Sequence, residues 1–453
     1  MSPFRMQMPF VARPWTTIVV RRFVATCLAV ASLTASLACH GMLDVTDPTL
    51  VQDRDIANSA GANARRLAVS SSFNSIVSMM AGDVALITDE RMVDARPINA
   101  STNQVFLDRR DGAAYEARNV PNDPHLGQWD GVFTQAALAI AAVHAYATDS
   151  LRGDYLAQLF AIRGYTALQV AEDICPGFPL NDLTPDGQPK LGGPLTTDSA
   201  ITYAMSQLDS AEHYAVDSIR FLNLARVAKG RALLDLGHYA EAAAAVAGVP
   251  TDFVYLPDWV NFVYVQPYQW SGVRLAVGNL DGGTGLPFAS AADPRTPVIY
   301  KTVRYGNAAD SLYDQRKYTN NSVPMVVASG VEARLIEAEA ALQANDPQWL
   351  AILNQLRATA ITPAMSSISN PPATHDAQVD LLYRERAFWL YLTGRRLGDL
   401  RRLIRNYGRM PESVFPTGAY PLGGSYGPAT AIPFVYDVQR RFNPHITSGC
   451  TTR

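Results

Sequence analysis

Residues that bind metals or act as strong nucleophiles are scarce in this chain. Four cysteines and seven histidines are scattered among 453 residues. A cysteine-based zinc site needs more ligands at closer spacing. The sequence also lacks a His-Glu-x-x-His pair, a phosphate-binding loop and a dinucleotide fingerprint. We therefore expect neither a metal site nor a bound cofactor.

Charge of one sign is not concentrated either. The chain has 38 basic and 41 acidic residues, and no basic patch of the kind that binds nucleic acid. Beyond the first 40 residues, the longest apolar run covers residues 136–147 and contains His144. This run is well short of the roughly 20 residues that cross a bilayer. The sequence thus favours neither a nucleic-acid-binding protein nor a membrane-spanning one.

The N-terminus has the layout of an export signal. A basic segment precedes an apolar run, and a small residue stands just before Cys39. We predict a lipoprotein signal peptide over residues 1–38, with Cys39 acylated as the first mature residue. Ser36 occupies the place where such signals usually carry leucine, so a plain secretory signal is the alternative. The apolar run is too short for a transmembrane anchor. The pattern consists of Arg13, Arg21, Arg22 and residues 23–37.

Export also bears on the remaining cysteines. Cys27 leaves with the signal and Cys39 is taken by lipid, so Cys175 and Cys450 remain as an even pair in an oxidising compartment. We predict a disulfide between them, worth about 2–4 kcal/mol. Two buried free thiols are the alternative.

The middle of the chain shows helical periodicity. One hairpin is expected to turn at Gly237, where the sequence Gly-x-Tyr-x-x-Ala is typical of tetratricopeptide repeats and the small Ala242 permits close packing. Helical repeats are therefore expected over approximately 130–250 and 330–360. The segments that carry the pattern are Tyr155–Ile174, Ile201–Ala215, Leu222–Val249 and Val331–Ala360.

Residues 381–408 place well-spaced charges in an otherwise apolar segment. Two helices are expected to meet at Gly394. Buried charges are tolerated only when they are paired, so we expect the four charged residues to neutralise one another at this junction. These residues are Glu385, Arg386, Arg396 and Asp399.

This segment resembles the C-terminal signature of the SusD/RagB family of nutrient-binding outer-membrane lipoproteins. The matching features are Glu-Arg, Gly-x-Arg and Asp-Leu followed by a basic pair, whereas Trp389 and Thr393 stand where the family has glutamates. Further matches make the resemblance cover nearly all of the mature chain, and they lie at residues 41–48, Asp293–Arg295, Lys317-Tyr318 and Asn443-Pro444.

The resemblance implies a mainly α, SusD-like fold over residues 39–453. It would combine tetratricopeptide-like helical hairpins with a loop-rich irregular region. The loop-rich ligand region is expected over approximately 251–330, and the helical signature over 378–408.

Aromatic residues gather between positions 253 and 270, beside amides and a carboxylate. Sugars are bound by stacking on such rings, although rings also fill cores. Asp89 and Arg91 are weaker ligand candidates, because residues 81–91 resemble an early family region near ligand contacts; Trp129 is expected in the core. The aromatic candidates are Trp259, Tyr264, Tyr268 and Trp270.

By resemblance, the protein would bind a glycan or another nutrient at the cell surface. It would then deliver this ligand to a SusC-like TonB-dependent transporter in the outer membrane, without covalent chemistry. One alternative is a tetratricopeptide-like scaffold lipoprotein with no small-molecule ligand. Another is a glycoside hydrolase, or a serine hydrolase built on Ser425, Asp437 and His445, but Ser425 lacks the strand-turn-helix context of a nucleophile elbow.

Overall fold

The computed structural model describes residues 56–93, 103–118, 126–184, 186–257, 275–305, 308–319 and 323–450. Apart from Ile56, all of them belong to one compact unit, Ala57–Arg453. Helices dominate this unit, so the predicted mainly α class is confirmed. No helix among the described residues is long and apolar enough to cross a membrane. The predicted signal peptide and Cys39 lie outside the described residues.

The longest described helix, α2 (Ser59–Ile87), was not predicted from the sequence. It begins at Asn58, whose side chain accepts a hydrogen bond of 2.9 Å from the backbone N–H of Gly61. Its second half is buried on nearly every side between Phe73 and Ile87. A helix enclosed in this way shows no amphipathic period, which is why periodicity did not reveal it.

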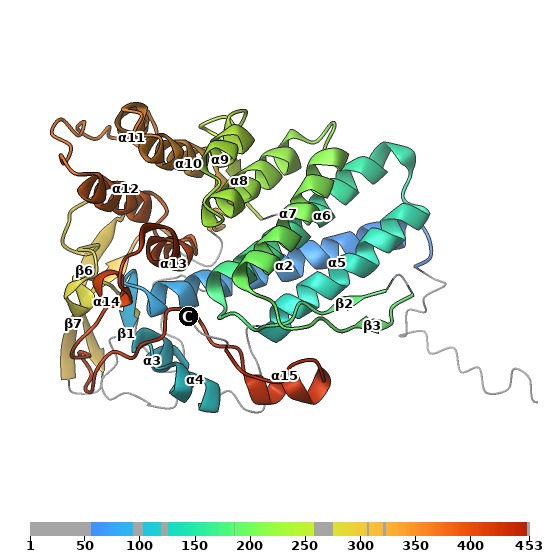
Figure 1. Ribbon diagram of the computed structural model, residues 1–453, viewed down its shortest axis with the longest axis horizontal. Helices are drawn as coiled ribbons and strands as arrows, with labels where there is room; N and C mark the ends of the chain where they lie inside the picture. The colour runs from blue at the N-terminus through green and yellow to red at the C-terminus, as the bar shows by residue number, and fades with distance from the viewer. Residues whose placement is uncertain are drawn as a thin grey trace, which may run out of the picture. The chain divides into compact units, whose positions relative to one another are not determined.

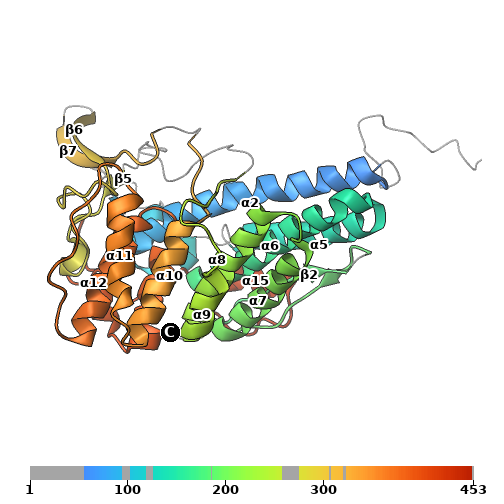
Figure 2. The same cartoon turned by 90° about the horizontal axis from the view of Figure 1, so that it is seen from above.

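The predicted helical hairpins are confirmed. From α6 onward, each helix packs against the next as far as α11, and Figure 2 shows this succession from above. The helices are α6 (Asp149–Asp173), α7 (Thr197–Tyr214), α8 (Ile219–Asp235), α9 (Tyr239–Val246), α10 (Gly330–Gln343) and α11 (Gln348–Thr359).

The hairpin of α8 and α9 turns where the sequence predicted. Gly237 has a φ of +77°, in the left-handed region that glycine adopts without steric cost. Ala242 is fully buried between the two helices. A Cβ atom at Gly230 would lie 2.5 Å from Val246 Cγ1, so the helices approach too closely for any larger residue there.

Further helices complete the unit, and α12 and α13 are joined through Gly394, which has a φ of +75°. This confirms the predicted meeting of two helices. Trp129 on α5 is 1% exposed and belongs to the core, as expected. The remaining helices are α3 (Asn103–Asp108), α4 (Gly112–Arg118), α5 (Leu126–Tyr146), α12 (His375–Trp389), α13 (Arg396–Tyr407), α14 (Pro411–Val414) and α15 (Tyr436–Phe442), with the short 3₁₀-helix η2 (Asp281–Gly283).

The region predicted to be rich in loops contains regular strands as well. The largest pair, β6 and β7, forms an antiparallel hairpin (Figure 1). The other antiparallel pairs are β1 with β5, β2 with β3, and β4 with β8. The strands are β1 (Arg91–Val93), β2 (Asp182–Leu183), β3 (Pro189–Lys190), β4 (Val254–Tyr255), β5 (Leu275–Val277), β6 (Val298–Tyr305), β7 (Ala308–Gln315) and β8 (Ala328–Ser329).

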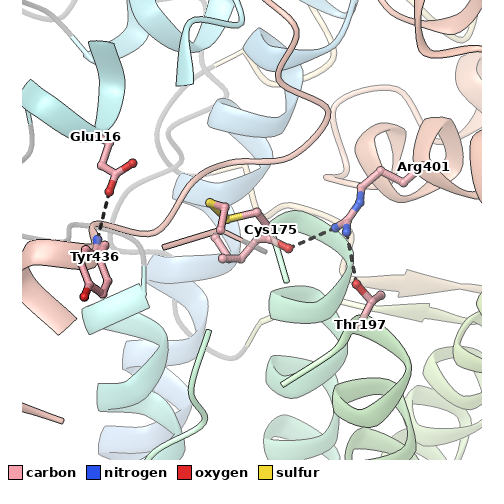
Figure 3. Close-up of a disulfide and its surroundings, with 7 residues drawn as sticks. Glu116, Cys175, Thr197, Arg401 and Tyr436 are labelled. Carbon is pink, nitrogen blue, oxygen red and sulfur yellow. Dashed lines mark hydrogen bonds between the residues drawn. A yellow bond between two sulfur atoms is a disulfide. The ribbon is translucent and has the colours of Figure 1, made fainter. Parts of the chain in front are cut away.

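Cys175 and Cys450 form a disulfide, the pairing that the cysteine count predicted; their Cα atoms are 5.4 Å apart. Figure 3 shows Arg401 beside this bridge, where it donates hydrogen bonds to the Ile174 carbonyl oxygen at 3.2 Å and to Thr197 Oγ1 at 3.3 Å. The bridge therefore ties the C-terminal segment to the end of α6.

Candidate functional site

The four aromatic ligand candidates, Trp259, Tyr264, Tyr268 and Trp270, lie outside the described residues. The structure does place the chain on both sides of them. On the N-terminal side, β4 pairs with β8, and on the C-terminal side, β5 pairs with β1. The described residues that precede and follow these candidates in the sequence are therefore both held by strand pairing.

The pairing of β1 with β5 joins the two regions that were predicted to contact a ligand. Arg91 lies opposite Val277, although they are far apart in the sequence. A Cβ atom at Gly278 would lie 2.0 Å from the carbonyl oxygen of Asp89, so only glycine permits this approach. We call β1, β5 and residues 278–290 the β1–β5 corner.

Asp89 and Arg91 themselves are interior residues, which corrects the prediction that they contact a ligand. Each is 1% exposed. Asp89 accepts hydrogen bonds from Arg396 at 2.7 and 2.8 Å and from the backbone N–H of Leu286 at 2.8 Å. Burial lowers the pKa of Arg91 to about 10. Asp89 therefore fixes the β1–β5 corner to α13.

The charged residues near Gly394 also pair differently from the prediction. Arg386 and Asp399 do bind each other, at 2.8 and 3.0 Å. Glu385 points elsewhere because adjacent residues on a helix project about 100° apart. Its partners, and that of Arg396, come from distant segments: Arg295 and Arg357 bind Glu385, and Asp89 binds Arg396.

Trp389 differs from the SusD/RagB signature that this segment resembles, and it contacts Arg295, one of these partners. Trp389, which stands where the family has a glutamate, lies beneath the Arg295 guanidinium at 5.1 Å. A cation above an aromatic ring is stabilised without a second carboxylate. Arg295 also binds Glu385 at 2.7 Å and Asp293 at 2.6 Å. The Trp389 ring therefore lies within a charge network in which Asp293 and Glu385 supply the carboxylates that bind Arg295.

Arg402 on α13 lies at the centre of the most deeply buried part of this network. It is 2% exposed and binds carboxylates from three other positions. Burial opposes ionisation of Asp399, but Arg386 and Arg402 outweigh this effect and lower its pKa to about 2. The carboxylates bound by Arg402 are those of Glu339, Asp235 and Asp399.

A long loop, residues 416–429, has both of its ends held by Arg110. This arginine donates hydrogen bonds to the Pro416 carbonyl oxygen at 2.5 Å and to the Ala429 carbonyl oxygen at 2.8 Å. Its guanidinium also lies 4.6 Å from the Phe415 ring centroid. Loops with closely spaced, fixed ends are compact and frequently functional.

The same loop is tied to the β1–β5 corner through Asp108. The Asp108 carboxyl accepts hydrogen bonds from the backbone N–H of Val93 and from the Tyr420 hydroxyl, both at 2.6 Å. Burial raises the pKa of Asp108 to about 8, and it raises that of the neighbouring Asp281 to about 6. Tyr426 packs edge-on against Tyr420, with ring centroids 5.2 Å apart. No sequence pattern predicts this cluster, since its members are far apart in the chain and match no motif.

Ser425, the possible hydrolase nucleophile, lies in the same loop. Gly423 and Gly424 before it have φ values of +106° and +80°, and Ser425 forms an isolated bridge with Ala419. No helix follows Ser425 until α15, more than ten residues later. A nucleophile elbow requires a strand before the serine and a helix directly after it. The loop has neither feature.

The described residues contain no group of three or more histidine, cysteine or acidic side chains placed to hold a metal ion. The β1–β5 corner and the loop at 416–429 instead combine tyrosine rings, backbone groups and carboxyls. Tyr420 and Asp108 are buried and bind each other, so these groups fix the loop to the corner.

Comparisons with known proteins agree with this description at the level of the fold. No family model matches the chain, and no curated protein is detectably similar in sequence. A SusD superfamily protein from Bacteroides vulgatus superposes with a TM-score of 0.62 at 11% identity, over 87% of this chain and 99% of that one. Two further solved structures are also similar in fold. The surface glycan-binding protein A from Bacteroides uniformis has a TM-score of 0.60 at 12% identity, over 86% and 99% of the two chains. A putative sugar-binding protein from Bacteroides vulgatus has a TM-score of 0.59 at 16% identity, over 86% and 98%.

Proposed function

We propose that this chain, which has the fold of SusD superfamily proteins, binds a glycan or a related nutrient at the cell surface and passes it to a SusC-like TonB-dependent transporter. The structural neighbours support this proposal, since several are described as carbohydrate-binding, sugar-binding or glycan-binding proteins. The observation that carries it is the pairing of β1 with β5, which brings together two regions predicted to contact a ligand, next to the loop that carries Tyr420 and Tyr426.

We further propose that the protein acts by binding and release and not as an enzyme. Release into a transporter requires only that affinity differ between two states of the complex. The buried carboxylates of the charge network support this reading, because arginines already neutralise them. Ser425 also lies outside the context that a hydrolase serine requires.

The scaffold alternative has one observation in its favour. The succession of helical hairpins from α6 to α11 resembles the stacked helices that other proteins use to bind partner proteins. A chain with that role would bind no glycan, so a ligand screen separates the two proposals.

The ligand site can be tested with Trp259→Ala and Trp270→Ala in the full-length chain. We expect each variant to bind a glycan identified on an array about tenfold more weakly, because an aromatic ring supplies both contact area and stacking. Titration calorimetry would measure the affinities. Phe442→Ala is the matched control, since Phe442 is 75% exposed on α15, outside this segment. Equal affinity in all three variants would remove the site assignment, and absence of glycan binding by the parent chain would favour the scaffold.

The proposed membrane attachment depends on Cys39. A single acyl chain binds a bilayer only marginally, whereas several chains anchor a protein stably. We expect the protein to incorporate labelled palmitate in its native type of host and to partition into detergent. Cys39→Ser should abolish both properties, whereas Cys27→Ser should leave them unchanged. Export of the unlabelled parent protein as a free solute would contradict lipid anchoring.

A further inference from the structure

Two turns of the helical unit share a six-residue sequence pattern. Residues 147–152, where α5 turns into α6, read Ala-Thr-Asp-Ser-Leu-Arg, and residues 215–220, where α7 turns into α8, read Ala-Val-Asp-Ser-Ile-Arg. In both turns the alanine is buried, whereas the aliphatic residue at the fifth position is exposed. Packing within the unit therefore accounts for the alanine but not for the exposed aliphatic residue.

The two turns lie at the same end of the unit. Helices α6 and α7 pack against each other, and a Cβ atom at Gly153, near the start of α6, would lie 3.3 Å from the carbonyl oxygen of Tyr214 at the end of α7. His144, near the end of α5, also contacts the Tyr214 ring, with ring centroids 6.0 Å apart. The exposed residues of the two turns are therefore neighbours in space.

Exposed apolar side chains are concentrated at these turns. Val216 is 83% exposed and Ile219 is 63% exposed, and Tyr146 and Leu151 are 43% and 42% exposed. Four of the twelve large apolar residues that are exposed in the described part of the chain thus belong to the two turns. Single exposed apolar residues are ordinary, but a cluster of them marks an interaction surface. We call these four residues the apolar tip.

The charged residues of the two turns balance. Asp149 and Arg152 form an ion pair at 2.7 Å on the first turn, and Asp217 and Arg220 supply one charge of each sign on the second. These four charges sum to zero. A partner would therefore be attracted to the apolar tip through the burial of apolar side chains and not through its charge.

The start of α2 lies at this end as well. The Arg66 guanidinium, in the second turn of α2, is 4.3 Å from the centroid of the Tyr155 ring near the start of α6. Figures 1 and 2 both show the first residues of α2 beside the turn between α5 and α6. The apolar tip therefore lies at the end of the unit from which the chain leads back toward Cys39.

The proposed lipid anchor indicates what covers the apolar tip. Sixteen residues separate Cys39 from Ile56. A chain of that length spans at most about 60 Å, even when fully extended. An acylated Cys39 would thus keep the start of α2 within that distance of the bilayer. Tethering raises the effective concentration of lipid at the tip, so a weak apolar contact suffices.

We propose that the apolar tip rests on the bilayer that holds Cys39, with Val216 and Ile219 at the boundary between headgroups and acyl chains. This inference rests on the proposed lipid anchoring and adds a second membrane contact that orients the helical unit. Tyr146 suits the same interface, because its ring is apolar and its hydroxyl stays hydrated. The β1–β5 corner follows the other end of α2, about 40 Å along that helix, and would stay clear of the lipid.

The test uses the full-length acylated chain reconstituted into phosphatidylcholine vesicles. A fluorophore on Val216→Cys reports on the apolar tip, and the same fluorophore on Phe442→Cys is the matched control. Phe442 is 75% exposed, and the next residue, Asn443, binds Asn181 beside the start of α5, at the far end of that helix from the tip. We expect nitroxide-labelled lipids to quench the fluorophore at position 216 about threefold more than the one at position 442.

Two further measurements test the apolar character of the contact. Addition of Leu151→Ser and Ile219→Ser to the labelled Val216→Cys chain should reduce its quenching about threefold, because less apolar surface is then buried in lipid. Replacement of one third of the lipid by anionic phosphatidylglycerol should leave the quenching unchanged, because the charges of the two turns balance.

The outcomes separate this inference from the proposed anchoring. If the protein stays with the vesicles but the two fluorophores are quenched equally, or neither is quenched, the apolar tip is no membrane contact, although the anchor stands. If the fluorophore at position 216 is shielded only after a partner protein is added, the tip is a protein contact and the membrane assignment is overturned. If the parent chain carries no lipid and does not stay with the vesicles, the anchoring fails, and this inference fails with it.

Discussion

Replacement of Arg402 by methionine is expected to lower the free energy of unfolding by about 3–5 kcal/mol, because it leaves buried carboxylates without their cation. Arg402 donates to Glu339 at 2.9 and 3.1 Å, to Asp235 at 2.9 Å and to Asp399 at 2.8 Å. Its side chain is 1% exposed, and those of its three partners are 5% exposed or less. Water cannot replace the lost interactions at such a site. Urea denaturation followed by circular dichroism would measure the loss.

Arg405 provides the matched control one helical turn further along α13. It also binds an aspartate, Asp198, but its side chain is 30% exposed and that of Asp198 is 64% exposed. Exposed ion pairs contribute about 0–1 kcal/mol, so Arg405→Met should be nearly neutral. Equal losses in the two variants would show that burial of the network does not determine its energetic importance. If Arg402→Met fails to fold, Arg402→Lys keeps the charge and should give an intermediate, measurable loss.

Asp108 should make the protein less stable as the pH rises. Its pKa increases from 3.8 to about 8 on folding, chiefly because burial disfavours the charged form. Its stabilising contribution is therefore complete below about pH 4 and is lost as the pH rises through about 8. Asp108→Asn cannot ionise and keeps an acceptor for the N–H of Val93 and the hydroxyl of Tyr420. We expect the free energy of unfolding of this variant to exceed that of the parent chain increasingly between these pH values, by a difference on the order of a few kcal/mol.

The comparison of parent and variant is essential here, since burial also raises the pKa values of Glu90 and Asp173, to about 8 and about 7. These groups affect both proteins equally and cancel in the difference. Asp437→Asn is the control, because the Asp437 side chain is 47% exposed on α15. Its difference from the parent chain should not grow with pH. A constant difference for Asp108→Asn would show that this carboxyl is ionised in the folded protein.

The helical hairpins could be predicted because each depends on neighbouring residues. Apolar spacing, the glycine at 237 and the small Ala242 act within one supersecondary unit, and the structure forms the hairpin there. Helix α2 escaped prediction for the opposite reason. It is enclosed by other helices, so its apolar residues do not fall on one face.

The candidate site could be predicted only in part. The composition predicted an aromatic segment. It could not show that Asp89 is buried and accepts hydrogen bonds from Arg396 and Leu286. Tyr300 and Tyr313, which lie opposite each other in the β6–β7 hairpin, could not be recognised as a pair, because their contact depends on the register of a hairpin that was expected to be irregular. The local sequence does not determine which residues will lie opposite each other in a pair of strands.

The sequence by itself determined the mainly helical class, the positions of several turns and the presence of a charge-rich C-terminal junction, because these follow from propensity, periodicity and the cost of burying unpaired charge. The tertiary structure alone decided how those charges pair. Glu385 binds Arg295 and Arg357, and Arg396 binds Asp89, since helix geometry points adjacent side chains toward different distant segments. The same long-range packing brings β1 beside β5, which joins residues 91–93 to the residues that follow the aromatic segment in the sequence.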